Sequence, residues 1–379
     1  MDRLVLDTNQ LVEKDWRLRG AAMRLIEKAI ELELVSLVVP QIVVDEANNK
    51  FRQRLEADVK SMHDATGRVS RLVDSKIQVP TVDIAKQWEK YRSDLDQRLT
   101  QLGAKRPGYT AVKHEWLVSK ALGSQRPFRE KDRGYRDALV WHSVLYDVAS
   151  TEYQTYLVSE NKTDFGDTEG GLHPDLVADL KAIGLDGRVT YVHDLQKFVD
   201  ETIKPALEKA PTPLTVEAFE ELFEKQLDSI IDQLRRAIDK EGLSDLPYEL
   251  FEGGAYIYQL GLVSAQPTDA YRLDDTSYYT SFDVLVEATF DQTVYAPDAV
   301  WLADQLDISG VTHGDSKTTD LDFTLTIPLA LEVVTSTEEG EEPEVSVELK
   351  EFYGFCPSCR HPILSDSAEH CSGCGRALV

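Results

Sequence analysis

Four carboxylates in the first half of the chain stand where they could share a divalent cation. Asp7 ends the apolar run in LVLDTNQLVE, and Glu46 lies in VVDEANNKF, shortly after a second apolar run. Asp137 opens the apolar segment GYRDALVWH, and Asp164 follows a third apolar run in LVSENKTDF, together with Asn161. Clustered carboxylates repel one another unless a cation neutralises them. Oxygen ligands without histidine favour Mg²⁺ or Mn²⁺ over Zn²⁺.

Each acid also has a structural explanation that the sequence leaves open. Asp7 could cap the helix that follows it, and Glu46 could be a surface residue of its helix. Asp137 could pair with one of the neighbouring arginines 133 and 136 in a salt bridge. Asp164 could be an ordinary turn residue.

A second set of metal ligands lies at the end of the chain, in FCPSCRHPILSDSAEHCSGCGRALV. Two Cys-x-x-Cys pairs, separated by eleven residues, supply four thiolates suited to tetrahedral Zn²⁺. The segment resembles a zinc ribbon, and its metal would be structural. Its only basic residues besides two histidines are Arg360 and Arg376, so a protein partner is as plausible as nucleic acid. The predicted ligands are Cys356, Cys359, Cys371 and Cys374.

Alternating strand and helix patterns place the four acids on one sheet edge. Apolar runs predict strands at 3–6, 36–40, 155–160 and 189–192, and helical periodicity predicts helices at 16–33, from 41 onward, at 135–150 and at 173–184. Such an order is typical of a parallel sheet with crossover helices, hence an α/β fold. The carboxyl ends of parallel strands share one edge, so distant acids can converge there.

Three domains are predicted. Residues 1–205 form the α/β domain, with a polar, helical insertion at about 57–125. Residues 206–350 form an acidic α+β domain that starts with one long amphipathic helix at 216–240 and continues with alternating, strand-like segments at 281–295, 321–334 and 344–353. Residues 351–379 form the zinc ribbon.

The charge of the chain is distributed unevenly. The formal net charge is −26, yet residues 51–150 carry 19 basic and 13 acidic residues, whereas residues 201–379 carry 11 and 35. The whole-chain charge argues against nucleic acid, but the basic segment could still face phosphate. The chain has no stretch of 18 apolar residues and no visible signal peptide, and its cysteines are clustered as in a metal site. We therefore expect a cytoplasmic protein without a membrane partner.

A basic run leads directly into Asp137. The run RPFREKDRGYRD also contains two aromatic residues and a glycine, which suits a loop that grips a single nucleic-acid strand. A solvated loop is the alternative. The candidate substrate-binding residues are Arg126, Arg129, Lys131, Arg133 and Arg136.

Four segments together resemble the signature blocks of the PIN-domain nucleases. These segments are LVLDTNQLV, VVPQIVVDEANNKF, KDRGYRDALVWHSVL and YLVSENKTDF, in the order found in that family. The resemblance covers roughly residues 1–200, is closest to long prokaryotic PIN-like proteins, and departs from a minimal PIN domain in the insertion at 57–125.

The resemblance implies a metal-dependent phosphodiesterase that hydrolyses RNA, an endoribonuclease. It makes Asp7, Glu46, Asp137 and Asp164 the ligands of catalytic Mg²⁺ or Mn²⁺, with Thr8, Asn9, Ser159 and Asn161 as supporting hydrogen-bond partners. PIN nucleases are often dimers, so a homodimer is also considered. RNA is the expected partner, and the ribbon or the acidic domain could contact a protein. Two alternatives stay open: a non-catalytic nucleic-acid- or protein-binding scaffold on a PIN fold, and a structure-specific DNA nuclease.

Overall fold

The structure is a computed structural model that divides the chain into two compact units, residues 1–207 and 208–379. The predicted domain limits at 205/206 and 350/351 remain predictions. The described residues are 1–73, 77–110, 112–129, 133–211, 214–243, 254, 256–295, 308–313, 318–336, 343–350, 354–356, 358–359, 361–364, 368 and 370–377.

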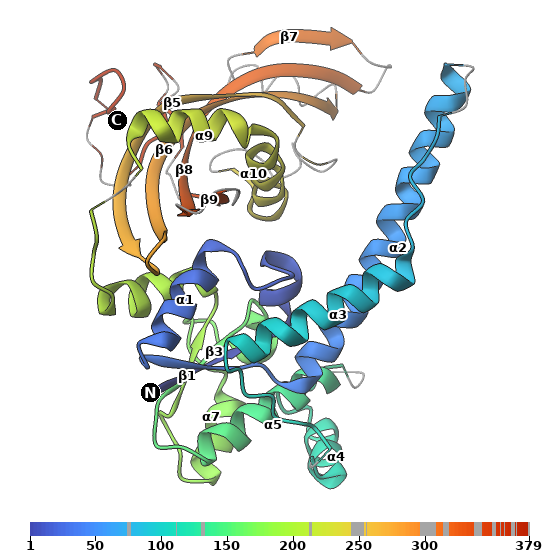
Figure 1. Ribbon diagram of the computed structural model, residues 1–379, viewed down its shortest axis with the longest axis vertical. Helices are drawn as coiled ribbons and strands as arrows, with labels where there is room; N and C mark the ends of the chain where they lie inside the picture. Colours follow the sequence, from blue (N-terminus) through green and yellow to red (C-terminus); the bar gives the residue numbers. More distant parts are fainter. Residues whose placement is uncertain are drawn as a thin grey trace. The chain divides into compact units, whose positions relative to one another are not determined.

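A four-stranded parallel sheet forms the centre of the first unit (Figure 1). Its strands are β1 (Asp2–Leu6), β2 (Val35–Val38), β3 (Thr155–Val158) and β4 (Val189–Val192), in the order β2-β1-β3-β4. Leu4, Val5 and Leu6 are fully buried. Helices that cover both faces of a parallel sheet explain why its strands are continuous apolar runs in the sequence. The predicted α/β class, with a parallel sheet flanked by helices, is confirmed.

The helices of this unit match the predicted pattern, with one shifted start. The predicted helix at 16–33 begins only at Ala21, because the Asp15 carboxylate accepts from the backbone nitrogens of Arg17 and Gly20 and holds a turn before it. The α-helices are α1 (Ala21–Glu31), α2 (Gln41–Leu72), α3 (Ile84–Gln101), α4 (His114–Leu122), α5 (Tyr135–Ala149), α6 (Lys162–Phe165), α7 (Pro174–Ala182) and α8 (Leu195–Phe198). Short helical turns are η1 (Gln10–Lys14), η3 (Val199–Ile203) and η4 (Lys204–Ala206).

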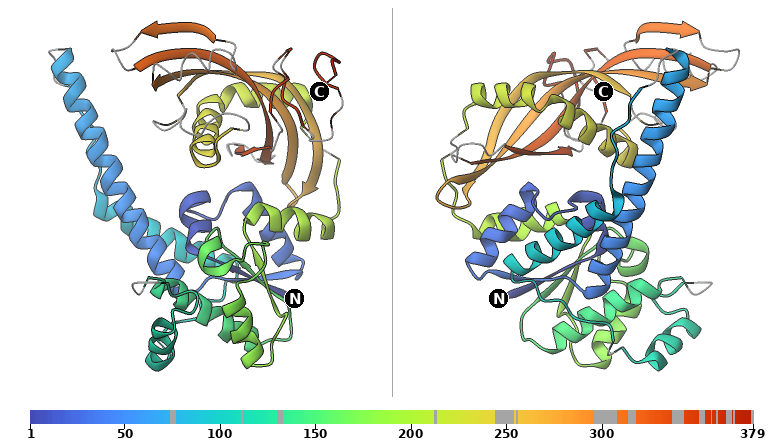
Figure 2. Two further views of the ribbon diagram at one scale, coloured as in Figure 1. Left: turned by 180° about the vertical axis from the view of Figure 1, so that it is seen from behind. Right: turned by 45° about the vertical axis from the view of Figure 1, so that its right-hand side comes forward.

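Much of the predicted insertion is an antiparallel pair of helices, α2 and α3. The Phe51 and Tyr91 rings stack with centroids 3.9 Å apart, and Trp88 Nε1 donates to the Asn48 carbonyl oxygen at 3.1 Å. The Asp83 carboxylate caps α3 by accepting from the Lys86 backbone nitrogen at 3.0 Å. Helix α2 therefore continues well beyond the start of α3 (Figures 1 and 2).

The second unit is built on a five-stranded antiparallel sheet. Its strands follow the path β5-β6-β8-β7, and β9 also pairs with β8. The strands are β5 (Ile257–Arg272), β6 (Ser277–Tyr295), β7 (Ile308–His313), β8 (Thr318–Ser336) and β9 (Glu344–Leu349). Strands β5 and β7 were not predicted.

The predicted single helix at 216–240 is wrong in one respect: it is two helices, α9 (Val216–Lys225) and α10 (Leu227–Glu241), which meet at Gln226. Phe219 and Phe223 of α9, and Ile230 and Leu234 of α10, are completely buried in the same core as the sheet. The break at Gln226 lets both halves place their apolar faces in this core. No described helix is long and apolar enough to cross a lipid bilayer.

Candidate active site at the carboxyl edge of the parallel sheet

The strand order places Asp7 at the centre of one sheet edge. Asp7 directly follows β1, which has β2 on one side and β3 on the other. Glu46 lies in the helix after β2, and Asn161 and Asp164 follow β3. The chain leaves β1 toward one neighbour and later returns on the other side, and ligands of open α/β sheets bind at such a switch point.

Three hydrogen bonds hold the Asp7 carboxylate, which is only 6 % exposed. The Thr8 backbone nitrogen donates to Oδ1 at 2.7 Å. Ser159 Oγ donates to Oδ2 at 2.5 Å, and Asn9 Nδ2 donates to the same oxygen at 3.2 Å. The following turn has Asn9 as its N-cap, without a side-chain cap bond. Asp7 is therefore held toward β3 and does not act as the helix cap that the sequence left open.

Glu46 is connected to Asp7 through Thr8. Thr8 Oγ1 donates to Glu46 Oε2 at 3.0 Å. Lys50 Nζ lies 3.5 Å from Oε1, and Arg136 donates to the same oxygen. The Glu46 side chain is 12 % exposed. The supporting threonine thus links two of the acids, while two cations balance the charge of Glu46.

Asp137 lies in the first turn of α5 and faces the segment after β3. Asn161 Nδ2 donates to Asp137 Oδ1 at 3.2 Å. Among the described ion pairs, Arg136 pairs with Glu46 and neither Arg133 nor Arg136 pairs with Asp137. A carboxylate in the first helical turn is also favoured by the helix dipole. Its contacts therefore differ from those of the surface salt bridge considered from the sequence.

Asp164 is 2 % exposed and lies in the short helix α6. Arg129 donates to both of its carboxylate oxygens through Nε and Nη2. Asn161 Nδ2 donates to Asp164 Oδ2 at 2.8 Å, and so the same amide contacts both Asp137 and Asp164. A buried, bidentate ion pair is unusual for an ordinary turn residue.

The electrostatics show that the acids influence one another. Burial raises the pKa of Asp7 from its ordinary 3.8 to about 6; repulsion from Asp137 and Glu46 adds to this shift, while the hydrogen bond from Ser159 opposes it. Burial also raises the pKa of Asp137, with repulsion from Asp164 and Glu46 acting in the same direction. A site with such a concentration of negative potential fits a hard divalent cation.

The acids nevertheless form an open arrangement in which arginines and amides lie between carboxylates. Within the described part of the chain, three or more metal-ligating atoms come within 4.8 Å of one another only among the cysteines. Arg129 forms an ion pair with Asp164, and Arg136 forms one with Glu46.

The predicted basic loop is only partly described. Arg129 and Arg136 contact the acids, and Arg133 is exposed. Arg126 is half-buried, and its backbone nitrogen donates to Asp175 Oδ2 at 2.8 Å. Lys131 lies outside the described residues. Two of the candidate phosphate contacts therefore pair with carboxylates of the site.

Two supporting residues were missed by sequence reasoning. Tyr191 of β4 donates its hydroxyl to the Ser159 carbonyl oxygen at 2.6 Å, behind Asp7. Gly134, with φ of 104°, precedes α5, and a Cβ there would lie 2.0 Å from the Pro127 carbonyl oxygen. Only glycine fits this close approach. The glycine in the basic run was a visible signal for this position, whereas Tyr191 carries none.

The four cysteines form a separate cluster whose sulfur atoms lie within 4.8 Å of one another and could hold a metal ion. Cys356 Sγ is 3.8 Å from Cys374 Sγ, and Cys359 Sγ is 3.5 Å from Cys371 Sγ. The backbone nitrogens of Ser358 and Gly373 donate to sulfur atoms of the cluster at 3.4 and 3.3 Å.

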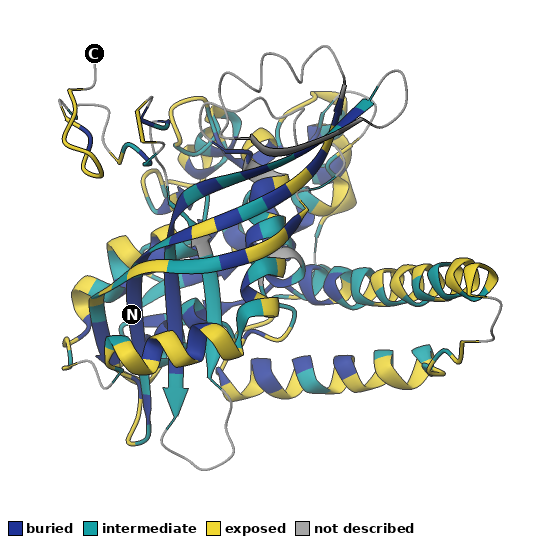
Figure 3. Ribbon diagram, turned by 90° about the horizontal axis from the view of Figure 1, so that it is seen from above, coloured by how far each residue is buried: buried dark blue, intermediate teal, exposed yellow. Residues whose placement is uncertain are grey.

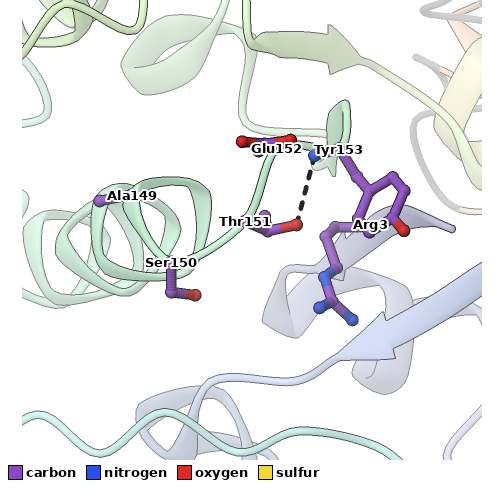
Figure 4. A pocket seen from close by; sticks show the side chains of 6 residues that line it. All are labelled: Arg3, Ala149, Ser150, Thr151, Glu152 and Tyr153. Atoms are coloured by element: carbon purple, nitrogen blue, oxygen red, sulfur yellow. Dashed lines mark hydrogen bonds between the residues drawn. The ribbon is translucent and has the colours of Figure 1, made fainter.

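A shallow hollow of about 540 Å³ lies away from the acids (Figure 4). It is near the amino ends of β1 and β3, opposite the edge that carries Asp7, and contains none of the four acids. Its lining residues are Arg3, Ala149, Ser150, Thr151, Glu152 and Tyr153.

Comparison with known proteins bears on the same segment. Neither the curated proteins nor the solved structures gave a match to the chain. A family model described as PIN domain matches residues 4–165, a range that includes all four acids, and the parallel sheet with its helices is consistent with the PIN fold. The part of the chain that carries the candidate site therefore matches the PIN domain, a family whose members are generally nucleases that use divalent metals.

Proposed function

We propose that this protein is an Mg²⁺- or Mn²⁺-dependent endoribonuclease. One observation carries the proposal: Asp7, Glu46, Asp137 and Asp164 come from four separate segments to one sheet edge, connected through Thr8, Ser159 and Asn161. The raised pKa values of Asp7 and Asp137 add support, because these buried charges gain most from a bound cation.

The protein's own side chains define the roles in this proposal. The four acids would hold the cation, which would polarise the phosphodiester and acidify a water. Ser159 and Thr8 orient Asp7 and Glu46 through donated hydrogen bonds. Asn161 holds Asp137 and Asp164 with one amide. Arg129 and Arg136 supply positive charge beside the acids, where a phosphate would bind.

RNA is the proposed substrate because it is the usual substrate of PIN nucleases. The proposed location is the cytoplasm, where four clustered thiols would stay reduced. A DNA substrate is the rival that the experiment must separate, because a cation held by carboxylates can activate the phosphodiester bond of either polymer.

Cleavage of matched single-stranded RNA and DNA, with and without Mn²⁺, tests the proposal. The comparison uses the full chain as wild type, Asp137→Asn, Glu46→Gln and the control Asp45→Asn. Asp45 neighbours Glu46 but is exposed and accepts from Gln41 and Tyr109, away from the other acids. We expect Mn²⁺-dependent cleavage of RNA by the wild type and Asp45→Asn, and a loss of at least about a thousandfold in the two site variants.

Each other result has a defined meaning. If the protein cleaved DNA but not RNA, the proposed substrate would be wrong and the proposed site would stand. Equal cleavage by the wild type and Asp137→Asn would reject the site. No cleavage by a folded, metal-loaded wild type would favour a binding role.

We also propose that the four cysteines hold a structural Zn²⁺. Tetrahedral zinc with bonds of about 2.3 Å places sulfurs roughly 3.8 Å apart, close to the 3.8 and 3.5 Å observed between the paired sulfurs. The backbone N–H groups that point at sulfur would stabilise thiolates. One zinc per chain by elemental analysis is the expected result, and none in freshly purified protein would contradict it.

A further inference from the structure

The strongest unassigned feature is the outward-facing side of α2. Helix α3 begins at Ile84 and runs beside only the first half of α2, so that residues from about 59 to 72 extend beyond it. No residue of α2 after Ala47 is buried, and Figure 3 shows this outer stretch as exposed or intermediate. The helix thus offers a long solvent-facing surface that begins at the candidate active site.

The exposed and covered sides of α2 can be distinguished by helical spacing. Leu55, Val59, Met62 and Thr66 recur every three or four residues and are half-buried. Near the end of α2, the Ile77 backbone nitrogen donates to Ser70 Oγ at 3.1 Å as the chain returns. At 100° per residue, the opposite side of the helix is the one that carries Glu46.

Basic residues continue from Glu46 along that opposite side. Lys50 and Arg54 follow at intervals of four residues, and Lys50 Nζ lies 3.5 Å from Glu46 Oε1. Arg68 and Arg71 lie on the same side near the outer end of the helix. Ala57 and Ser61 lie between the two basic pairs, and Asp64 is an acidic member of this face. We call Lys50, Arg54, Arg68 and Arg71 the basic row.

The outer members of the row are the freer ones. Arg54 pairs with Asp58 at 2.9 Å, with its side chain 72 % exposed. Among the described residues, Arg68 and Arg71 form no ion pair or side-chain hydrogen bond, and both are exposed. Glu46 and Arg71 are 25 residues apart, which is about 38 Å along an α-helix. A ligand that uses the whole row must be long and negatively charged.

We propose that the basic row of α2 binds the phosphate backbone of a single-stranded RNA whose cleaved bond lies at the four acids. The proposal rests on the proposed function, since the first residue of the row, Lys50, lies beside Glu46. Arginines spaced along an exposed helix can contact successive phosphates without reading bases. The outer pair, Arg68 and Arg71, lies in the insertion, so the row would give this protein a preference for long strands that the acids alone cannot supply.

The test measures affinity for two RNA lengths in the full chain carrying Asp137→Asn, so that RNA stays intact. Fluorescence anisotropy is recorded with oligonucleotides of about six and about twenty nucleotides, over a range of salt. The variant is Arg68→Gln/Arg71→Gln. The control is Arg52→Gln, because Arg52 lies on another side of α2, over the Trp88 ring. Far-UV circular dichroism checks that both variants keep the helix.

The expected result is selective for length. The double variant should raise the Kd of the long RNA about tenfold and reduce its salt slope by about 1.4, because two phosphate contacts are lost. The short RNA and the Arg52→Gln control should be unchanged. Cleavage of the short RNA by the same variants with an intact Asp137 should also persist, which separates this proposal from the catalytic one.

Three outcomes would overturn the proposal. An affinity of the double variant for the long RNA equal to that of its Asp137→Asn parent would show that RNA does not use the row. An equal loss for both RNA lengths would indicate a general charge effect. A similar loss for Arg52→Gln would show that no particular side of α2 is used.

Discussion

Replacing Asp7 by asparagine should stabilise the cation-free protein while it removes one carboxylate from the candidate metal site. Burial and neighbouring acids raise the pKa of Asp7 from 3.8 to about 6. Each pKa unit corresponds to about 1.4 kcal/mol, so ionised Asp7 costs the folded state about 3 kcal/mol at neutral pH. The asparagine amide of the variant carries no charge, but it has only one oxygen that can accept hydrogen bonds. The wild-type carboxylate accepts from Ser159, Asn9 and Thr8, so the substitution also removes part of this hydrogen bonding. A net gain of about 1–2 kcal/mol therefore remains.

The difference in stability between Asp7→Asn and the wild type should depend on pH. A carboxyl group whose folded pKa is raised destabilises the fold fully above pH 6, and the penalty disappears as the pH falls below 3.8. Asp7→Asn should therefore exceed the wild type in stability at pH 8 and lose this advantage near pH 4, where the lost hydrogen bonds make the variant the less stable protein. Urea unfolding followed by tryptophan fluorescence is a suitable assay, because four of the five tryptophans lie in residues 1–207.

The stability of Asp7→Asn and the wild type should also be compared with and without Mn²⁺. In buffer without Mg²⁺ or Mn²⁺, Asp7→Asn should be the more stable protein at pH 8. Saturating Mn²⁺ should stabilise the wild type and leave the variant unchanged, since only a protein that binds the ion gains from it. A variant that is less stable than the wild type without Mn²⁺, at both pH values, would show that the hydrogen bonds outweigh the buried charge.

Three other substitutions give similarly direct tests. Arg129→Gln removes the cation that covers Asp164, so Mn²⁺ affinity by calorimetry should rise, by up to about tenfold. Gly134→Ala should destabilise the first unit by more than about 2 kcal/mol in urea, because its Cβ would clash with the Pro127 carbonyl oxygen. Cys371→Ser should release the zinc, measured by elemental analysis, because a four-thiolate site loses a buried ligand.

Matched controls separate these effects from general damage. Arg133→Gln changes an exposed arginine of the same loop and should leave Mn²⁺ affinity unchanged. Gly184→Ala has a similar positive φ of 73° but meets nothing within 4 Å, so it should cost only about 1 kcal/mol. His370→Ala alters a residue outside the cysteine cluster and should retain zinc. Equal effects of a substitution and its control would contradict the assigned cause.

The strands of the parallel sheet could be predicted because most of their residues are buried and apolar. The runs before Asp7 and Ser159 are continuous, and each ends at a polar residue on the shared edge. The order of strands and helices along the chain was then enough to predict that the acids lie at one edge of the sheet, without any knowledge of side-chain contacts. Ser159 was expected as a supporting partner from the resemblance to PIN domains, and in the structure its hydroxyl donates to Asp7.

Other features depend on contacts that no local pattern records. The ion pairs of Arg129 and Arg136 join segments far apart in the chain, and a basic run equally suggests a solvated loop. The division of the 216–240 helix at Gln226 arises where both halves pack into the sheet core, although the apolar spacing continues across it. Strand β5 has three irregularities in its pairing with β6, which obscure the alternation that would have revealed it.

The position of β1 in its sheet has a consequence for protein synthesis. β1 is the first strand made, yet it lies between β2 and β3, and it pairs with β3 at Thr155–Val158. A ribosome adding about 5–20 residues per second would need roughly 8 to 30 seconds to extend the chain from Asp7 to Asp164. Until then the nascent chain has neither the Ser159 hydroxyl that holds Asp7 nor the fourth acid. The four acids of the candidate site therefore cannot act together until the first domain is almost complete, so the proposed activity could not reach the messenger RNA during most of that domain's synthesis.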